Sequence, residues 1–153
     1  ELGIGQAEAK EYIDSYFDRY KGVRRFLDGI LEEARRDRYV CTLLNRRRYI
    51  PAITSSNAAL RQFAERTAIN APIQGTAADL IKIAMINLHG LLKKRHPKAS
   101  MIMQVHDELV FEAPEAEKEA LMALVKREME GVMTLRAPLK VEIRAGQNWD
   151  EAH

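Results

Sequence analysis

Two adjacent carboxylates, Asp107 and Glu108, are the side chains in this sequence whose type and position most clearly suggest chemistry. They separate two apolar runs, Met101–Val105 and Leu109–Phe111, whose composition is typical of β-strands. A tight hairpin would hold both carboxylates on rigid backbone at its tip, as oxygen ligands for a hard cation such as Mg²⁺. Two-metal phosphoryl transfer needs such a site. The more common explanation of two neighbouring acids is a solvated turn without metal, and a lone His106 is more typical of a structural histidine.

A second group of polar residues, Arg66, Asn70 and Gln74, recurs every four positions. This spacing places Arg66 and Asn70 on one helical face, and all three side chains can donate hydrogen bonds. We call these three residues the polar ladder. Such a ladder suits the phosphates, sugars and minor-groove edges of a nucleic-acid duplex. An ordinary solvated helix face would show the same spacing.

Together these stretches resemble the family A DNA polymerases, of the bacterial DNA polymerase I type. Gln104–Glu112 is similar to the third palm motif of that family, which carries one of its catalytic aspartates. Arg66–Asp79 is similar to the palm-side helix that follows the primer–template. Arg46–Pro51 resembles a basic hairpin segment of the family, and Asn148–His153 resembles its usual C-terminus. The resemblance covers nearly the whole chain and implies the last fingers helices and the palm.

The sequence also departs from the family pattern. No stretch matches the first palm motif, which supplies the other essential aspartate, or the fingers helix whose Lys and Tyr handle the incoming nucleotide. Lys21 stands where Pro is usual, Arg38 where Gly is usual, and Asn45 where Gly or His is common, so the local turns are in question. We therefore interpret the chain as a C-terminal piece of a polymerase that is inactive by itself.

The resemblance implies a reaction and the residues that carry it. The reaction is template-directed addition of deoxynucleotides to a primer 3′ end, with two Mg²⁺ ions as cofactors. Asp107 would be a catalytic metal ligand, and Glu108 a nearby catalytic carboxylate with a weaker or indirect metal role. The implied DNA contacts are Arg66, Asn70, Gln74 and His106, with Arg46 and Arg47 as further backbone contacts. The implied partners are primer–template DNA, deoxynucleoside triphosphates and the missing N-terminal part of the polymerase.

Composition limits the class of protein. With 153 residues, of which 46% are hydrophobic and 30% charged, the chain suits one globular domain or part of one. The sequence has no apolar stretch of membrane-spanning length, and its start lacks a signal-peptide pattern. A single cysteine, Cys41, permits no disulfide within the chain and fits a reducing cytoplasm. The resemblance adds an expected association with the bacterial nucleoid.

The net charge of +2 hides an asymmetry along the chain. Between Arg19 and Arg66 there are 12 basic and 5 acidic residues, a net charge of +7. Between Asp107 and Glu130 there are 3 basic and 8 acidic residues, a net charge of −5. A basic half is what a phosphate-binding surface requires, although basic helices are often simply solvated.

The hydrophobic pattern predicts an α+β fold that is helix-rich, with a small antiparallel sheet. The predicted helices are Gln6–Tyr20, Val23–Arg36, Asn57–Asn70, Thr76–Arg95 and Pro114–Glu130. The last of them has a predicted apolar face of Leu121, Leu124, Val125 and Met129. The aromatic and apolar faces of the first two helices are expected in the core, with Gly22 between them. Pro72 is expected to interrupt a helix, and Thr76 to cap the next one. The predicted strands are Tyr39–Leu44 with a return at Tyr49–Ile50, a hairpin within Ser100–Ala113, and a last strand at Leu139–Ile143. In this last strand apolar and charged residues alternate, so one of its faces is expected to be exposed to water.

The predicted division places the fingers-side helices and the basic hairpin in residues 1–56, and the palm with its carboxylate hairpin in residues 57–153. In the intact enzyme the palm sheet would gain a strand from the first palm motif, so one sheet edge is expected to be exposed here.

Two other functions remain open from the sequence. One is a non-catalytic nucleic-acid-binding module with an acidic turn. The other is a metal-dependent hydrolase built on His106, Asp107 and Glu108. The hydrolase has little support, because the remaining histidines lack metal-ligand spacing. These histidines are His89, His96 and His153.

Overall fold

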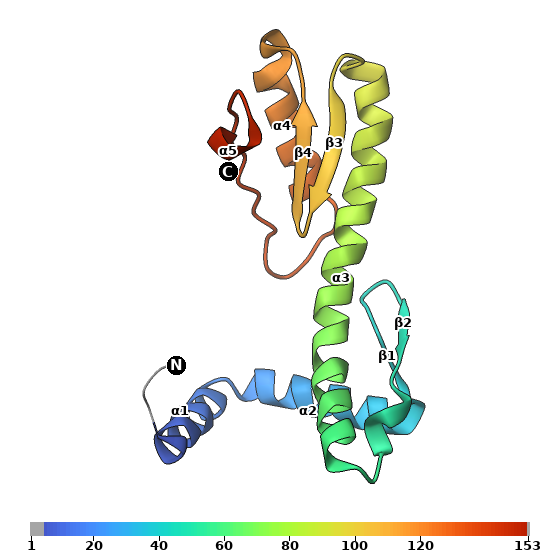
Figure 1. Ribbon diagram of the computed structural model, residues 1–153, viewed down its shortest axis with the longest axis vertical. Coiled ribbons are helices and arrows are strands. Elements are labelled where there is room, and N and C mark those ends of the chain that lie inside the picture. The colour runs from blue at the N-terminus through green and yellow to red at the C-terminus, as the bar shows by residue number, and fades with distance from the viewer. Residues whose placement is uncertain (1–4, 153) are drawn as a thin grey trace. The chain divides into compact units, whose positions relative to one another are not determined.

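The computed structural model describes residues 5–152, which divide between Thr76 and Ala77 into two compact units. Helix α3 (Ala58–Arg95) contributes residues to both units (Figure 1). The described residues are mostly helical and contain two small antiparallel sheets, one in each unit. The predicted class, α+β and helix-rich, is therefore confirmed.

The first unit contains two helices and a short hairpin before the start of α3. Its other elements are α1 (Gln6–Arg19), α2 (Lys21–Asp37), β1 (Tyr39–Cys41), β2 (Arg47–Tyr49) and the 3-10 turn η1 (Pro51–Thr54). The core is a cluster of buried residues from α2, the hairpin, η1 and α3, namely Ile30, Ala34, Val40, Ile50, Ile53, Ala64, Ala68 and Ala71. The three alanines of α3, Ala64, Ala68 and Ala71, recur at helical spacing, so the helix presents a smooth face on which the other elements pack closely.

The first two helices differ from prediction in where they separate. The break falls at Tyr20, whose φ and ψ are −110° and 57°, and Gly22 lies inside α2. The expectation that the aromatic face of α1 is core is wrong, because α1 has no buried residue and Tyr12 is 64% exposed. Phe26 on α2 is also exposed, whereas Ile30 is buried. Helical periodicity shows which residues share a face, but another element must cover that face before it is buried.

Two departures from the family pattern fall where the backbone is left-handed. Arg38 ends α2 with φ of 63°, and Asn45 has φ of 60° in the loop between β1 and β2. A non-glycine residue in this conformation costs roughly 1–2 kcal/mol. The Arg38 side chain donates a hydrogen bond to the hydroxyl of Thr54, which ties the end of α2 to η1.

The predicted interruption at Pro72 is wrong, since α3 is continuous from Ala58 to Arg95 with Pro72 inside it. Thr76 is not an N-cap: its hydroxyl donates to the Pro72 carbonyl at 2.6 Å and accepts the Leu43 N–H at 3.0 Å. A proline within a helix removes one hydrogen bond and costs about 3 kcal/mol, so packing and side-chain bonds must offset this loss.

The second unit packs a β-hairpin against two helices. It contains the rest of α3, then β3 (Ser100–Val105), β4 (Glu108–Glu112), the 3-10 turn η2 (Glu115–Glu117), α4 (Lys118–Glu130) and α5 (Trp149–Ala152). The buried cluster consists of Leu88, Leu92, Ala99, Leu121, Leu124 and Val125. Met101, Leu109 and Phe111 of the hairpin pack against this cluster. The predicted hairpin and the apolar face of α4 are confirmed, although α4 begins at Lys118, after a 3-10 turn that follows Pro114.

The predicted last strand at Leu139–Ile143 is wrong in the described structure, where this segment belongs to no sheet. Its alternating burial is present, and Ile143 packs against the core of the second unit. The Val141 N–H donates to the Glu130 carboxylate at 3.0 Å. Alternation therefore predicted correctly which side chains face inward, while strand pairing needs a neighbouring backbone as well.

None of the helices in the described residues combines the length and the hydropathy that a bilayer crossing requires.

The packing of α3 generates a stability prediction. Leu88 is fully buried, whereas Ile86, two residues earlier on the same helix, is 72% exposed. We expect Leu88→Ala to lower the free energy of unfolding by about 2–5 kcal/mol, because it leaves a cavity in the core. The matched variant Ile86→Ala should change it by less than about 0.5 kcal/mol. Urea unfolding followed by circular dichroism measures both, and equal losses would contradict the described burial.

Candidate functional site

A two-residue turn carries the acidic group of the second unit. Strands β3 and β4 pair antiparallel with Val105 opposite Glu108, so His106 and Asp107 form the turn and Glu108 is the first residue of β4. His106 has φ of 53°, and Asp107 has no positive φ, a combination found in the type II′ turns of two-residue hairpins. The Gln104 side chain donates from Nε2 to the His106 carbonyl at 3.0 Å. Strand register and this side chain together position Asp107.

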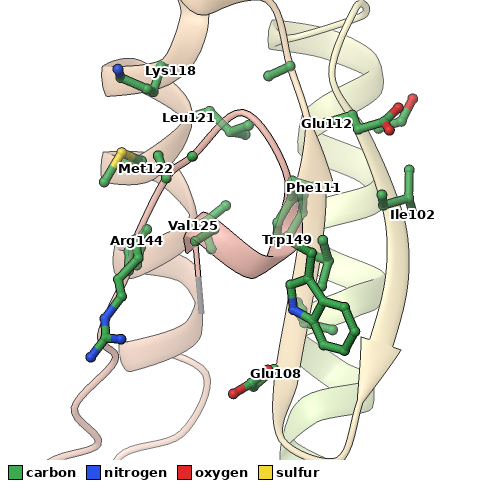
Figure 2. Close-up of a pocket in the computed structure, with 18 of the residues that line it drawn as sticks. Ile102, Glu108, Phe111, Glu112, Lys118, Leu121, Met122, Val125, Arg144 and Trp149 are labelled. Atoms are coloured by element: carbon green, nitrogen blue, oxygen red, sulfur yellow. The ribbon is translucent and has the colours of Figure 1, made fainter.

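An open groove adjoins the carboxylates within the second unit. Its volume is about 1340 Å³, and it lies between β4, α4 and the segment that leads to α5. Figure 2 shows Glu108 at one end of β4 and the indole of Trp149 alongside the same strand. Leu121 and Val125 of α4 also line the groove. The Asp107 and Glu108 side chains are exposed, so a ligand can approach them from this open space.

The donor set fits one kind of metal site. Among residues 5–152, no three His, Cys, Asp or Glu side chains gather as a metal-binding group. Two neighbouring carboxylates suit Mg²⁺, which proteins commonly hold through one or two carboxylates together with substrate phosphates and water. The hydrolase hypothesis gains no support from His96, whose Nδ1 pairs with the Glu117 carboxylate at 2.9 Å. His153 lies outside the described residues.

The polar ladder lies on the exposed side of α3 in the first unit. Arg66, Asn70 and Gln74 are all exposed, while Ala64, Ala68 and Ala71 are buried in the core. Two apolar side chains of the same helix, Phe63 and Ile73, are exposed as well, at 62% and 57%. The sequence interpretation did not name these two residues. Phe63 lies three residues before Arg66 and Ile73 three residues after Asn70, a spacing that places each beside the ladder on the helix surface.

The β1–β2 hairpin contacts α3 immediately beside Gln74. Arg46 donates from Nη2 to the Gly75 carbonyl at 2.8 Å, and the Leu43 N–H donates to the Thr76 hydroxyl at 3.0 Å. A Cβ atom on Gly75 would lie 2.6 Å from Cγ2 of Thr42, closer than carbon atoms approach. Gly75 therefore allows the hairpin to approach the helix, a role that the sequence interpretation missed.

Thr42 orders the loop between β1 and β2. Its hydroxyl accepts the N–H groups of Leu44 at 3.3 Å and Arg46 at 3.2 Å. The backbone N–H of Thr42 donates to the Arg46 carbonyl at 3.0 Å. The loop that carries Arg46 is thereby held by its own hydrogen bonds.

Arg47 lies within the hairpin, against aromatic rings. Its guanidinium stands 4.6 Å from the centre of the Tyr39 ring, and that ring pairs edge to face with Tyr49 on β2. A side-chain hydrogen bond with Tyr49 is the main cause that raises the pKa of Arg47 above its usual value. Arginine is always charged in proteins, and this side chain is exposed.

The predicted site residues divide between the two units. Arg46, Arg47 and the polar ladder belong to the first unit, and His106, Asp107 and Glu108 to the second. Within each unit these residues are brought together on a few neighbouring elements, as described above. None of these residues has a demonstrated role, so each assignment stays a prediction.

Comparisons with known proteins identify one family. The family model described as "DNA polymerase family A" matches residues 1–151. The chain is 51% identical over 151 residues to DNA polymerase I of Bacillus caldotenax, covering 99% of this chain and 17% of that protein. It is 47% identical over 152 residues to DNA polymerase I of Mycobacterium bovis, again covering 99% of this chain and 17% of that protein. The chain thus spans about a sixth of the length of these relatives.

A solved structure matches the fold. It is described as "POL domain of Pol1 from M. smegmatis complex with DNA primer-template and dNTP". The match has a TM-score of 0.95 and 46% sequence identity, and covers 99% of this chain and 27% of that chain.

The contact at Gly75 predicts opposite effects on stability for the same substitution at two glycines of α3. We expect Gly75→Ala to destabilise the protein by about 1–3 kcal/mol, because the new methyl group overlaps Thr42. Gly90→Ala, in the same helix with nothing within 4 Å of its Cβ position, should stabilise it by about 0.5–1 kcal/mol. Thermal or urea unfolding of both variants gives the sign of each change.

A third variant tests the cause. Thr42→Ser removes the Cγ2 methyl group and retains the hydroxyl, so Gly75→Ala should be nearly neutral when it is made in that background. A Gly75→Ala loss that persists with Thr42→Ser would mean that something other than this contact requires glycine.

Proposed function

The chain belongs to the family A DNA polymerases, and from this membership we propose that it forms part of an enzyme that extends a DNA primer along a template. The single observation that supports this most is the solved relative, whose description includes primer–template DNA and dNTP. That structure matches 99% of this chain with a TM-score of 0.95. Because the chain spans 17% of its relatives, we assign the complete reaction to a larger protein that contains it.

We propose Asp107 as the catalytic carboxylate and metal ligand of this part. Its turn is held by the β3–β4 register and by the Gln104 side chain, so little reorganisation is needed when a charged ligand arrives. Mg²⁺, when bound, would stabilise the negative charge that develops on the phosphoryl oxygens. Glu108 is the next residue, at the start of β4, and we propose a weaker or indirect role for it. The open groove beside both residues leaves room for substrate.

The polar ladder is our proposed contact with the primer–template. Arg66 would pair with phosphate, and the amides of Asn70 and Gln74 would donate to sugar or base-edge acceptors. We propose that His106, exposed in the turn beside Asp107, contacts DNA near the primer end. Arg47 is proposed as a phosphate contact, because its charge is permanent and exposed.

Acting alone, the chain is expected to bind DNA without extending it, because its sequence lacks a counterpart of the first palm motif. In that state it would behave as the nucleic-acid-binding module that we consider the second candidate function. The named relatives are polymerases of bacteria, which supports our proposal that the parent protein works in the cytoplasm at the chromosome.

DNA binding by the chain itself is the first test. We expect weak, sequence-independent binding to a labelled primer–template, with affinity falling steeply between about 50 and 200 mM salt. Arg66→Gln should reduce the slope of log affinity against log salt by about 1, because one phosphate contact is lost. Arg127→Gln, an exposed arginine on α4, is the matched control and should leave the slope unchanged. Fluorescence anisotropy provides the measurement, and an absence of binding at low salt would argue against the proposed surface.

The catalytic assignment is tested in a complete polymerase. For this test, a chimeric enzyme is made in which the chain replaces the matching segment of Bacillus caldotenax DNA polymerase I, to which it is 51% identical. We expect Asp107→Asn to lower single-turnover incorporation by on the order of 100-fold or more while DNA affinity stays near the parental value, because the amide keeps the shape and loses the charge. Glu108→Gln should be less harmful.

Glu112→Gln is the matched control for this substitution. Glu112 is an exposed carboxylate at the other end of β4, opposite Ser100, so its loss should leave incorporation unchanged. Near-parental turnover by Asp107→Asn would remove the catalytic assignment.

A further inference from the structure

We propose that Arg46 is a positioning residue: by bonding the Gly75 carbonyl, it holds the segment of α3 that carries Asn70 and Gln74 in the conformation that binds a duplex. The inference rests on the proposed function, because it concerns how the polar ladder meets DNA. It differs from the sequence-based prediction, in which Arg46 contacts the DNA backbone directly.

The need for support arises at Pro72, which lies between Asn70 and Gln74 on α3. Proline has no N–H, so the carbonyl of Ala68, four residues earlier, cannot accept its usual helical bond. The proline ring also crowds that carbonyl. The two amide side chains of the ladder are therefore carried on either side of the point where the helix loses one of its own hydrogen bonds.

The hairpin supplies bonds just after this point. Arg46 donates to the Gly75 carbonyl at 2.8 Å, and the Leu43 N–H donates to the Thr76 hydroxyl at 3.0 Å. The same hydroxyl donates to the Pro72 carbonyl at 2.6 Å. The helix turn that follows Pro72 is thus held from outside, by residues about 30 positions earlier in the chain.

Burial makes this contact specific. Thr42 and Thr76 are both only 8% exposed, and buried hydroxyls destabilise a fold unless they are hydrogen-bonded. Both are bonded here, Thr42 to its own loop and Thr76 to Leu43 and Pro72. The missing Cβ of Gly75 lets Thr42 approach the helix. A shifted hairpin would lose these bonds together, so Arg46 has one defined position.

Arg47 is the natural comparison, because it has the same charge at the next position of the same hairpin. Arg46 lies in the loop just before β2, and Arg47 is the first residue of β2. The guanidinium of Arg47 lies over the Tyr39 ring at 4.6 Å, whereas that of Arg46 reaches α3. Equal losses of charge at these two positions should therefore have different effects on DNA binding.

The experiment measures the affinity of the whole chain for a labelled primer–template between about 50 and 200 mM salt, for Arg46→Gln and Arg47→Gln. We expect Arg46→Gln to weaken binding roughly tenfold at every salt concentration with the salt slope unchanged, the loss typical of one charge-assisted hydrogen bond. Arg47→Gln should reduce the slope by about 1, as the loss of a phosphate contact does. Circular dichroism at the assay temperature confirms that each variant is folded.

Coupling to the ladder separates positioning from a general loss of stability. If Arg46 acts through the ladder, its effect should shrink once Gln74 is removed: adding Arg46→Gln to Gln74→Ala should weaken binding by clearly less than the roughly tenfold loss expected in the parent, because interacting residues are not additive. Thr76→Ser, which keeps the hydroxyl, should bind as the parent does, and Thr76→Val should resemble Arg46→Gln.

Two failures can be told apart. A parent chain that does not bind DNA at low salt would overturn the proposed function, and this inference with it. A parent chain that binds, with Arg46→Gln lowering the salt slope as Arg47→Gln does, would overturn this inference alone and make Arg46 a phosphate contact. Full additivity of Arg46→Gln and Gln74→Ala would likewise overturn the positioning role.

Discussion

The continuity of α3 through Pro72 is the constraint on which the packing of the first unit depends. In the first unit the helix buries an alanine face that includes Ala68, and in the second unit it buries Leu88. A helix that ended at the proline would remove its following turn from the contact with the β1–β2 hairpin. Burial on the one side and the Thr76 hydroxyl bonds on the other offset the lost backbone bond. A local defect is thus compensated by tertiary contacts.

Placement of the acidic turn depends on a second constraint, the register of β3 and β4. A shift of one residue would move every side chain of a strand to the opposite face and take Leu109 and Phe111 out of the core. Burial of those side chains therefore determines that the two-residue turn contains Asp107. His106 adopts a left-handed conformation that is unfavourable for a non-glycine residue, and the Gln104 side chain bonds its carbonyl. Core packing fixes the strand register and the Gln104 hydrogen bond supports the turn, so together they position a polar, exposed side chain.

Charge divides the molecule according to the chemistry proposed for it. The stretch with a net charge of +7 forms most of the first unit, and the stretch with −5 lies in the second. Phosphate backbones require the former, and divalent cations require carboxylates such as those of the latter. Neither charge pattern alone indicates an enzyme, because both occur on ordinary solvated surfaces. The family match and the place of Asp107 in its turn support our proposal that these stretches serve nucleotide addition.

The sequence by itself determined the class of fold, the hairpin that carries Asp107 and the buried face of α4, because turn chemistry and periodicity act between near neighbours. The family followed from short motifs and was confirmed. Only the tertiary structure decided which faces are covered, which segments pair as strands and where a helix continues. The aromatic face of α1 is exposed, and Leu139–Ile143 has no strand partner in the described residues. Helix α3 continues through Pro72. Those outcomes depend on contacts between residues far apart in sequence, such as the hydrogen bond from Arg46 to the Gly75 carbonyl. A local sequence pattern does not predict such contacts.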